Sequence, residues 1–168
     1  MAETARPRRA LQPNIDRYRR SLLAMGWLTL VLAALHLADH ALRSVQVHSH
    51  ALNPNWDHSG WPFKPQVTPY TYSLIAVALI LGIGLIGTYR RKLWAGYWLG
   101  AALVLVAIVT IVHFLPTARQ ESPTVIYGSW AGLPAVGVAA VAITFAIVAV
   151  LLLMAANAIR VGRATGRW

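Results

Sequence analysis

The sequence has no cysteine among its 168 residues. This absence excludes disulfides, thiolate metal sites, cysteine-ligated iron–sulfur clusters and thiol redox chemistry. Acidic residues are also scarce, with five Asp and Glu against fifteen Lys and Arg, and charged residues make up only 12% of the chain. Together with an apolar content of 57%, this composition lies outside the usual range of soluble domains and is typical of a membrane protein.

The net charge of +10 does not indicate a protein that binds nucleic acid. The basic residues are split among short segments between apolar runs and do not form one continuous face. No nucleic-acid partner is therefore expected, and membrane topology explains the charge better. Arginine outnumbers lysine by 13 to 2, a bias that favours a bacterial source with a GC-rich genome.

Four apolar stretches are each long enough to cross a bilayer. Hydrocarbon about 30 Å thick requires roughly 20 apolar residues per helical crossing. The predicted crossings are residues 21–42, 70–89, 93–115 and 133–159. The sequence therefore predicts an all-α, polytopic membrane protein, a bundle of four transmembrane helices within residues 21–160. Small residues in the second and third crossings favour close helix packing: Gly82, Gly84, Gly87, Gly96 and Gly100.

The distribution of basic residues predicts the orientation of the bundle. If the basic tails 1–20 and 161–168 lie in the cytoplasm with Arg160 and the turn at 90–92, twelve of the fifteen basic residues are on that side. The positive-inside rule then predicts that both termini are cytoplasmic, in a multi-pass protein of the plasma membrane. The outer loop 43–69 contains four prolines and three aromatic residues, so we expect it to be ordered.

All six histidines fall on the expected outer half of the molecule. Within the first crossing, His36, Asp39 and His40 share one helical face because residues three and four apart are neighbours. Arg43, four residues after Asp39, is the expected partner of its carboxylate. His113 lies at a similar depth in the third crossing, which runs parallel to the first. We therefore expect these side chains to meet on the extracytoplasmic side.

Several roles are compatible with such a cluster. A copper or zinc ion can be held by the imidazoles of His36, His40 and His113, with Asp39 as a ligand or as the acceptor for a ring N–H. Alternatively, a single haem can be held between His113 and one of the other two histidines. The remaining interpretations are proton transfer or acid–base catalysis, and a structural network in which the groups satisfy one another.

The expected outer loops add weaker candidates. His48 and His50 alternate along the chain, and His58 follows an aspartate, so these three are secondary candidate metal ligands in a segment that can cover the cluster. In the second outer loop, 116–129, Glu121 is expected to form an ion pair with Arg119 or with the opposite loop.

These observations lead to two functional hypotheses. The first is a small integral membrane subunit or accessory protein of a larger redox or metal-dependent membrane complex. Its partners would be the lipid bilayer and either other membrane subunits or further copies of itself in a homo-oligomer. The alternative is a compact membrane enzyme that acts on a lipid or isoprenoid substrate by His/Asp acid–base chemistry, so the sequence leaves open whether the chain is catalytic.

Overall fold

The computed structural model describes residues 8–49, 69–90, 94–115, 121–166 and 168, and every regular element within these ranges is a helix. The all-α class predicted from the sequence is confirmed for this part of the chain. The helices are α1 (Arg8–Ser49), α2 (Pro69–Tyr89), α3 (Ala95–His113), α4 (Pro123–Gly128) and α5 (Pro134–Thr165).

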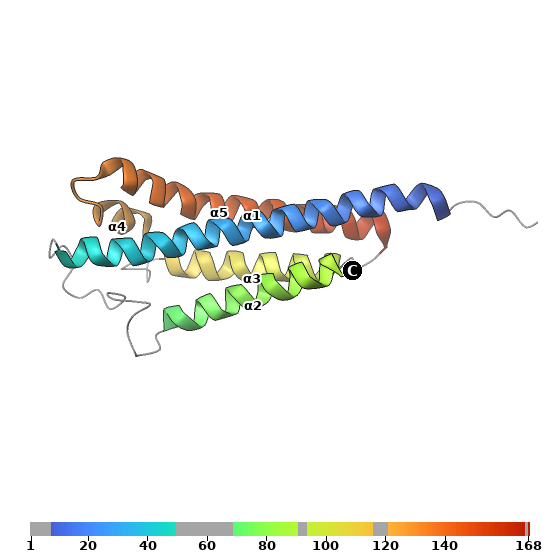
Figure 1. Cartoon of the computed structure of the whole chain (residues 1–168), viewed down its shortest axis with the longest axis horizontal. Helices are drawn as coiled ribbons and strands as arrows, with labels where there is room; N and C mark the ends of the chain where they lie inside the picture. Colours follow the sequence, from blue (N-terminus) through green and yellow to red (C-terminus); the bar gives the residue numbers. More distant parts are fainter. Residues whose placement is uncertain (1–7, 50–68, 91–93, 116–120, 167) are drawn as a thin grey trace, which may run out of the picture.

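The four long helices lie lengthwise beside one another and alternate in direction (Figure 1). Helix α5 makes the most extensive contacts, with α1 on one side and α3 on the other, whereas α2 packs mainly on α1. The short helix α4 packs against α5. One end of the bundle, called the cluster end below, holds the C-terminal ends of α1 and α3 together with α4. The other, called the basic end, holds the start of α1 and the C-terminal ends of α2 and α5.

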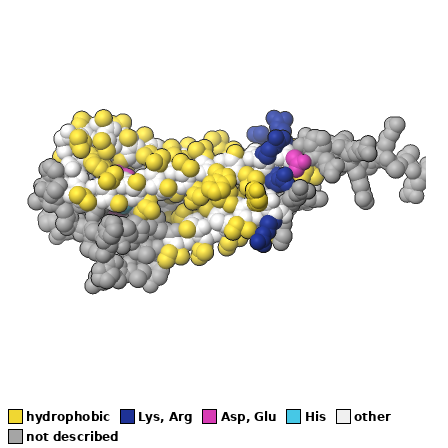
Figure 2. Space-filling view, in the orientation of Figure 1, with side chains coloured by type: hydrophobic (Ala, Val, Ile, Leu, Met, Phe, Trp, Pro, Cys, Tyr) yellow, Lys and Arg dark blue, Asp and Glu magenta, His cyan; other side chains and the backbone are white. Residues whose placement is uncertain are grey.

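Three helices in the described part of the chain are long and apolar enough to cross a membrane: Ile15–Arg43, Ala95–His113 and Pro134–Thr165. A shorter apolar stretch, Ile75–Tyr89, lies in α2. Hydrophobic side chains cover most of the described surface between the two ends of the bundle (Figure 2). A surface of this kind is stable in hydrocarbon and costly in water, so the fold is consistent with a membrane protein.

Basic side chains gather at one end of the bundle (Figure 2). Except for Arg43, every Lys or Arg whose side chain is described belongs to this basic end: Arg17, Arg19, Arg20, Arg90, Arg160 and Arg163. Asp16 lies among them and forms an ion pair with Arg19, with 3.2 Å between Oδ1 and Nη2.

Helix α1 extends beyond the predicted crossing at both ends. It begins at Arg8, inside the expected tail 1–20, and ends at Ser49, inside the expected loop 43–69. Arginine is a good helix former, which favours continuation at the start. At the cluster end, Gln46 Nε2 donates a hydrogen bond of 3.2 Å to the Ala131 carbonyl, and this tertiary contact supports the extra turns.

The other helices lie close to the predicted ranges, with two differences. Helix α5 continues past residue 159 to Thr165 and ends at Gly166, which has a left-handed backbone (φ 64°) that glycine adopts without strain. Helix α4 falls within the expected outer loop 116–129. Its start is specified locally, because Pro123 occupies its first turn and the Ser122 side chain accepts a hydrogen bond from the Val125 N–H.

The core of the bundle is centred on Trp98, which is fully buried and donates from Nε1 to Thr88 Oγ1 over 2.8 Å. Gly84 lies against this ring, where a Cβ would come within 2.9 Å of it, and a Cβ at Gly87 would lie 2.6 Å from the ring of Trp94. Close packing predicted at these two glycines is confirmed. A Cβ at Gly96 would lie 3.0 Å from the backbone of Trp168. At Gly82 and Gly100, by contrast, a Cβ would meet nothing within 4 Å.

Candidate functional site

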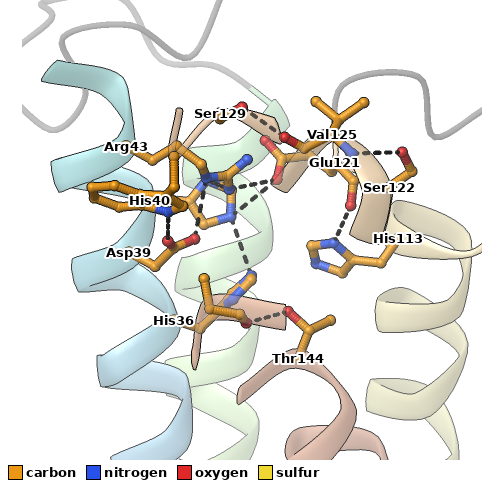
Figure 3. A network of polar contacts seen from close by, with 12 residues as sticks. His36, Asp39, His40, Arg43, His113, Glu121, Ser122, Val125, Ser129 and Thr144 are labelled. Atoms are coloured by element: carbon orange, nitrogen blue, oxygen red, sulfur yellow. Dashed lines mark hydrogen bonds and ion pairs between the residues drawn. The ribbon is translucent and has the colours of Figure 1, made fainter. Parts of the chain in front are cut away.

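A group of buried ionisable side chains, called the polar cluster below, occupies the cluster end of the bundle (Figure 3). Helix α1 contributes four of its members, α3 contributes one, and the segment before α4 contributes one. Arg43 has no exposed surface, and Asp39, His40, His113 and Glu121 are each at most 7% exposed. The sixth member is His36, which is half-buried.

The α1 members share one face because they are spaced three or four residues apart. Arg43 Nε donates to Asp39 Oδ2 over 3.2 Å, which confirms the ion pair predicted from the sequence. The other carboxylate oxygen, Oδ1, accepts a hydrogen bond of 2.9 Å from Trp130 Nε1. Both oxygens of Asp39 are therefore already engaged by buried donors.

Glu121 joins the cluster from the segment that leads into α4. Arg43 Nη2 donates to Glu121 Oε2 over 2.8 Å, and the same oxygen lies 3.5 Å from His40 Nε2. The partner of Glu121 is thus Arg43 of helix α1. Arg43 was expected to begin the first outer loop, so the contact corresponds to the expected ion pair with the opposite loop. Arg119, the other partner considered, lies outside the described residues.

The three imidazoles lie in direct contact between α1 and α3 (Figure 3). His36 Nε2 and His40 Nε2 are 3.1 Å apart, and the ring centroids of His36 and His113 are 5.0 Å apart in an edge-to-face arrangement. His113 Nδ1 lies 2.7 Å from the Glu121 carbonyl. Because a carbonyl can only accept, His113 Nδ1 carries the hydrogen, and in the neutral ring Nε2 keeps its lone pair.

Charged groups of both signs meet in the cluster. Two carboxylates, Asp39 and Glu121, face one guanidinium, Arg43, which stays protonated in proteins. These counts cover only the described residues.

A cavity of about 90 Å³ lies next to the imidazoles, within the bundle. The rings of His36, His40 and His113 form part of its wall. Thr29 and a set of aliphatic side chains from all four long helices complete the lining, among them Val77, Leu105, Val109 and Leu151. The structure thus places three imidazoles beside a small apolar space.

The sequence-predicted candidates fall into two sets. His36, Asp39, His40 and His113 come together as described, although no three His, Asp or Glu side chains within the described ranges are arranged as a preformed metal site. His48 belongs to α1 and not to a loop, and its side chain is not among those described. His50 and His58 lie outside the described residues.

Two members of the site were not recognised from the sequence. Trp130 has the position of an aromatic residue at the expected outer membrane interface, yet it is buried and donates to Asp39. Glu121 was considered for an ion pair but not as a neighbour of the histidines. The available signal was the capping sequence Ser122–Pro123, which predicts a helix start directly after Glu121 and hence a fixed position for it.

Comparisons with protein-family models, with curated proteins and with solved structures gave no match to this chain. The functional argument therefore depends on the chemistry of the polar cluster and its surroundings.

Proposed function

We propose that the chain crosses the plasma membrane four times, with both termini in the cytoplasm and the polar cluster on the extracytoplasmic side. The three long apolar helices support three of the crossings, and the apolar helix α2, which lies antiparallel between its neighbours in sequence, supports the fourth. The gathering of basic side chains at the opposite end from the cluster supports the orientation.

The absence of cysteine makes this topology directly testable. Single cysteines are introduced at Asp16, Tyr89 and Ala131, all exposed positions, and intact cells are treated with a membrane-impermeant maleimide. The proposal expects labelling of Ala131→Cys in intact cells, and labelling of the other two variants only after permeabilisation. Labelling of Tyr89→Cys in intact cells would contradict a membrane-spanning α2, and labelling of Asp16→Cys would contradict the orientation.

We further propose that the polar cluster binds one copper or zinc ion through His36, His40 and His113. The supporting observation is the 3.1 Å hydrogen bond between the Nε2 atoms of His36 and His40. Two nitrogen ligands about 2.05 Å from one tetrahedral ion lie about 3.3 Å apart, close to this separation, and the ion would replace the shared hydrogen. In His113, the N–H bond to the Glu121 carbonyl leaves Nε2 for the ion, an arrangement typical of metal-binding histidines.

The carboxylates have different roles in this proposal. Asp39 is held by Arg43 and Trp130, so it orients and balances the site without ligating the ion. Glu121 Oε2 lies 3.5 Å from His40 Nε2, which makes it the carboxylate oxygen closest to the proposed ligands. Within the described residues the cluster holds two carboxylates and one guanidinium, and nearby carboxylates favour a cation at the imidazoles.

A metal ion fits this geometry better than a haem. A haem between two histidines requires the rings to stand on opposite faces of the porphyrin, with the iron between them. Here the ring of His36 touches the rings of both His40 and His113, with centroid separations of 4.7 and 5.0 Å. The adjacent cavity of about 90 Å³ is smaller than the roughly 150 Å³ cavity that holds a single benzene. Both observations support a metal ion over a porphyrin.

We propose that the chain performs this role as a small subunit or accessory protein of a larger membrane complex. Large apolar side chains are exposed along α1, α2, α3 and α5, and such surfaces can contact lipid or other membrane subunits.

Metal analysis and an optical spectrum of natively purified protein test the metal proposal. We expect close to one equivalent of copper or zinc per chain, and a clearly lower content in natively purified His36→Ala and His113→Ala, which retain two of the three ligands. As a matched control, Thr144→Ala alters a fully buried polar side chain whose hydroxyl donates to its own helix, at Ala140, and should leave the metal content unchanged. A monodisperse, colourless monomer that is free of metal and does not bind added copper or zinc would contradict the proposal.

The apolar cavity favours a second candidate function, that of an enzyme acting on a lipid or isoprenoid substrate. The cavity of about 90 Å³ can admit only a short apolar segment of such a substrate, beside three imidazoles that can donate and accept protons. Since Asp39 is fully engaged, the histidines would be the acid–base groups. Incubation of the protein with a total lipid extract, followed by mass spectrometry, should then show a product that His36→Ala does not form. An unchanged lipid profile would remove this candidate.

A further inference from the structure

A second cavity lies between the middle of the bundle and its basic end. It is a groove of about 340 Å³ between α1 and α2, called the α1–α2 groove below. Leu23, Trp27 and Leu30 form its α1 side, which extends about 10 Å along the helix axis. Its α2 side is formed by Gly82, Leu85, Ile86, Tyr89 and the following residue, Arg90.

The groove is deepened by the lack of a side chain at Gly82, which lies in its wall. A Cβ at this position would meet no atom within 4 Å, so the glycine does not serve the packing of α2 against its neighbours. The close helix contact is instead made at Gly84, two residues further along the same helix. Gly82 therefore leaves an open space on the surface, lined by leucine and isoleucine, that a hydrocarbon chain can occupy.

The mouth of the groove is aromatic and basic, unlike its aliphatic interior. Trp27 is 57% exposed and Tyr89 is 79% exposed, and aromatic residues of these types are enriched where hydrocarbon meets headgroups. Arg90 is exposed directly beside them. The surrounding basic end carries five further described arginines but only one described acid, Asp16, which is paired with Arg19.

We propose that the α1–α2 groove is a binding site for an anionic phospholipid. One acyl chain lies in the groove over Gly82, and the phosphate group contacts the guanidinium of Arg90 at its mouth. Arginine recognises phosphate through paired N–H donors, and basic pockets between membrane helices select anionic headgroups. The groove and the cavity beside the proposed metal site share no lining residue, and the mouth of the groove at Arg90 lies at the basic end of the bundle.

The headgroup contact is tested by lipid retention. The protein is placed in nanodiscs containing equal amounts of phosphatidylglycerol and phosphatidylcholine, extracted mildly, and the lipid that remains bound is identified by native mass spectrometry. We expect retention of phosphatidylglycerol over phosphatidylcholine by at least about fivefold, the contribution of one basic residue near an anionic surface. Arg90→Gln should reduce this preference to near unity. Arg163→Gln, at an exposed arginine outside the groove, should leave it unchanged.

The acyl contact is tested by filling the groove. Gly82→Leu places a side chain in the open space and should abolish retention of both lipids, whereas Gly100→Leu, at an equally open glycine on α3, should retain them. The helical content and melting temperature of each variant in detergent report folding. If Gly82→Leu does not fold, Arg90→Gln decides alone, because its side chain lies on the surface. Equal retention of the two lipids by the unaltered protein, or an unchanged preference in Arg90→Gln, would overturn the proposal.

Discussion

The indole Nε1 of Trp130 donates a hydrogen bond of 2.9 Å to Oδ1 of Asp39, although 91 residues separate the two in the sequence. The other carboxylate oxygen accepts from Arg43 on the same helix. Asp39 therefore connects α1 to the segment that follows α4. This carboxylate is therefore an anchor that positions His36 and His40, its neighbours on the same helical face, and not an open acid–base group.

Replacing Trp130 by phenylalanine tests this anchor. Trp130→Phe keeps an aromatic ring in the buried space but removes the N–H donor to a carboxylate, a hydrogen bond that contributes about 1.5–3 kcal/mol. The free energy of unfolding in detergent micelles should fall by that amount. Trp27→Phe is the matched control, since Trp27 is 57% exposed and its substitution should have little effect. Equal effects of the two substitutions would show that the Trp130–Asp39 bond does not stabilise the protein.

The ion pair between Arg43 and Glu121 is a second testable contact. Arg43→Leu leaves two buried carboxylates without their shared cation, and removal of one partner of a buried ion pair typically costs about 3–5 kcal/mol. In the double variant Arg43→Leu/Glu121→Leu, the loss should be clearly smaller than the sum of the two single losses. A double-mutant cycle measures this coupling. Strict additivity would mean that the two residues do not stabilise each other directly.

Alanine substitutions at two glycines of α2 should change the stability of the protein in opposite directions. At Gly84, the new Cβ would lie 2.8 Å from the Tyr97 ring and 2.9 Å from Trp98, and overpacking of this kind costs about 1–3 kcal/mol. At Gly82 the same substitution meets no neighbour and should increase helix stability by up to about 1 kcal/mol. Thermal unfolding of both variants in the same detergent provides the comparison. A loss of stability in Gly82→Ala would contradict the open space inferred there.

Much of the α1 side of the polar cluster could be predicted from the sequence, because helical periodicity is a local property. The spacing of His36, Asp39, His40 and Arg43 fixes one face once the segment is helical, and the Asp39–Arg43 pair follows from it. For His113, the sequence predicts only how deep it lies along the bundle axis. Its contact with His36 depends on how α3 packs, which a single sequence does not specify.

The contact of Trp130 with Asp39, and that of Glu121 with the histidines, could not be predicted because they depend on the path of the chain between α3 and α5. An aromatic residue near an expected membrane interface is usually an anchor in the headgroup region, and nothing local distinguishes Trp130 from such a residue. The predicted first crossing stops at residue 42, whereas α1 continues to Ser49, for a related reason. Its last turns are polar, and tertiary contacts such as Gln46 with Ala131 stabilise them in place of apolar periodicity.

The number of imidazole nitrogens bound to the ion tests the proposed metal site most directly. X-ray absorption of the copper- or zinc-loaded protein should show three imidazole nitrogens, at about 2.0–2.1 Å for zinc. One of these nitrogens should be lost in His113→Ala, and none in His48→Ala. A shell made only of oxygen ligands, or one that is identical in the unaltered protein and in His113→Ala, would contradict the account.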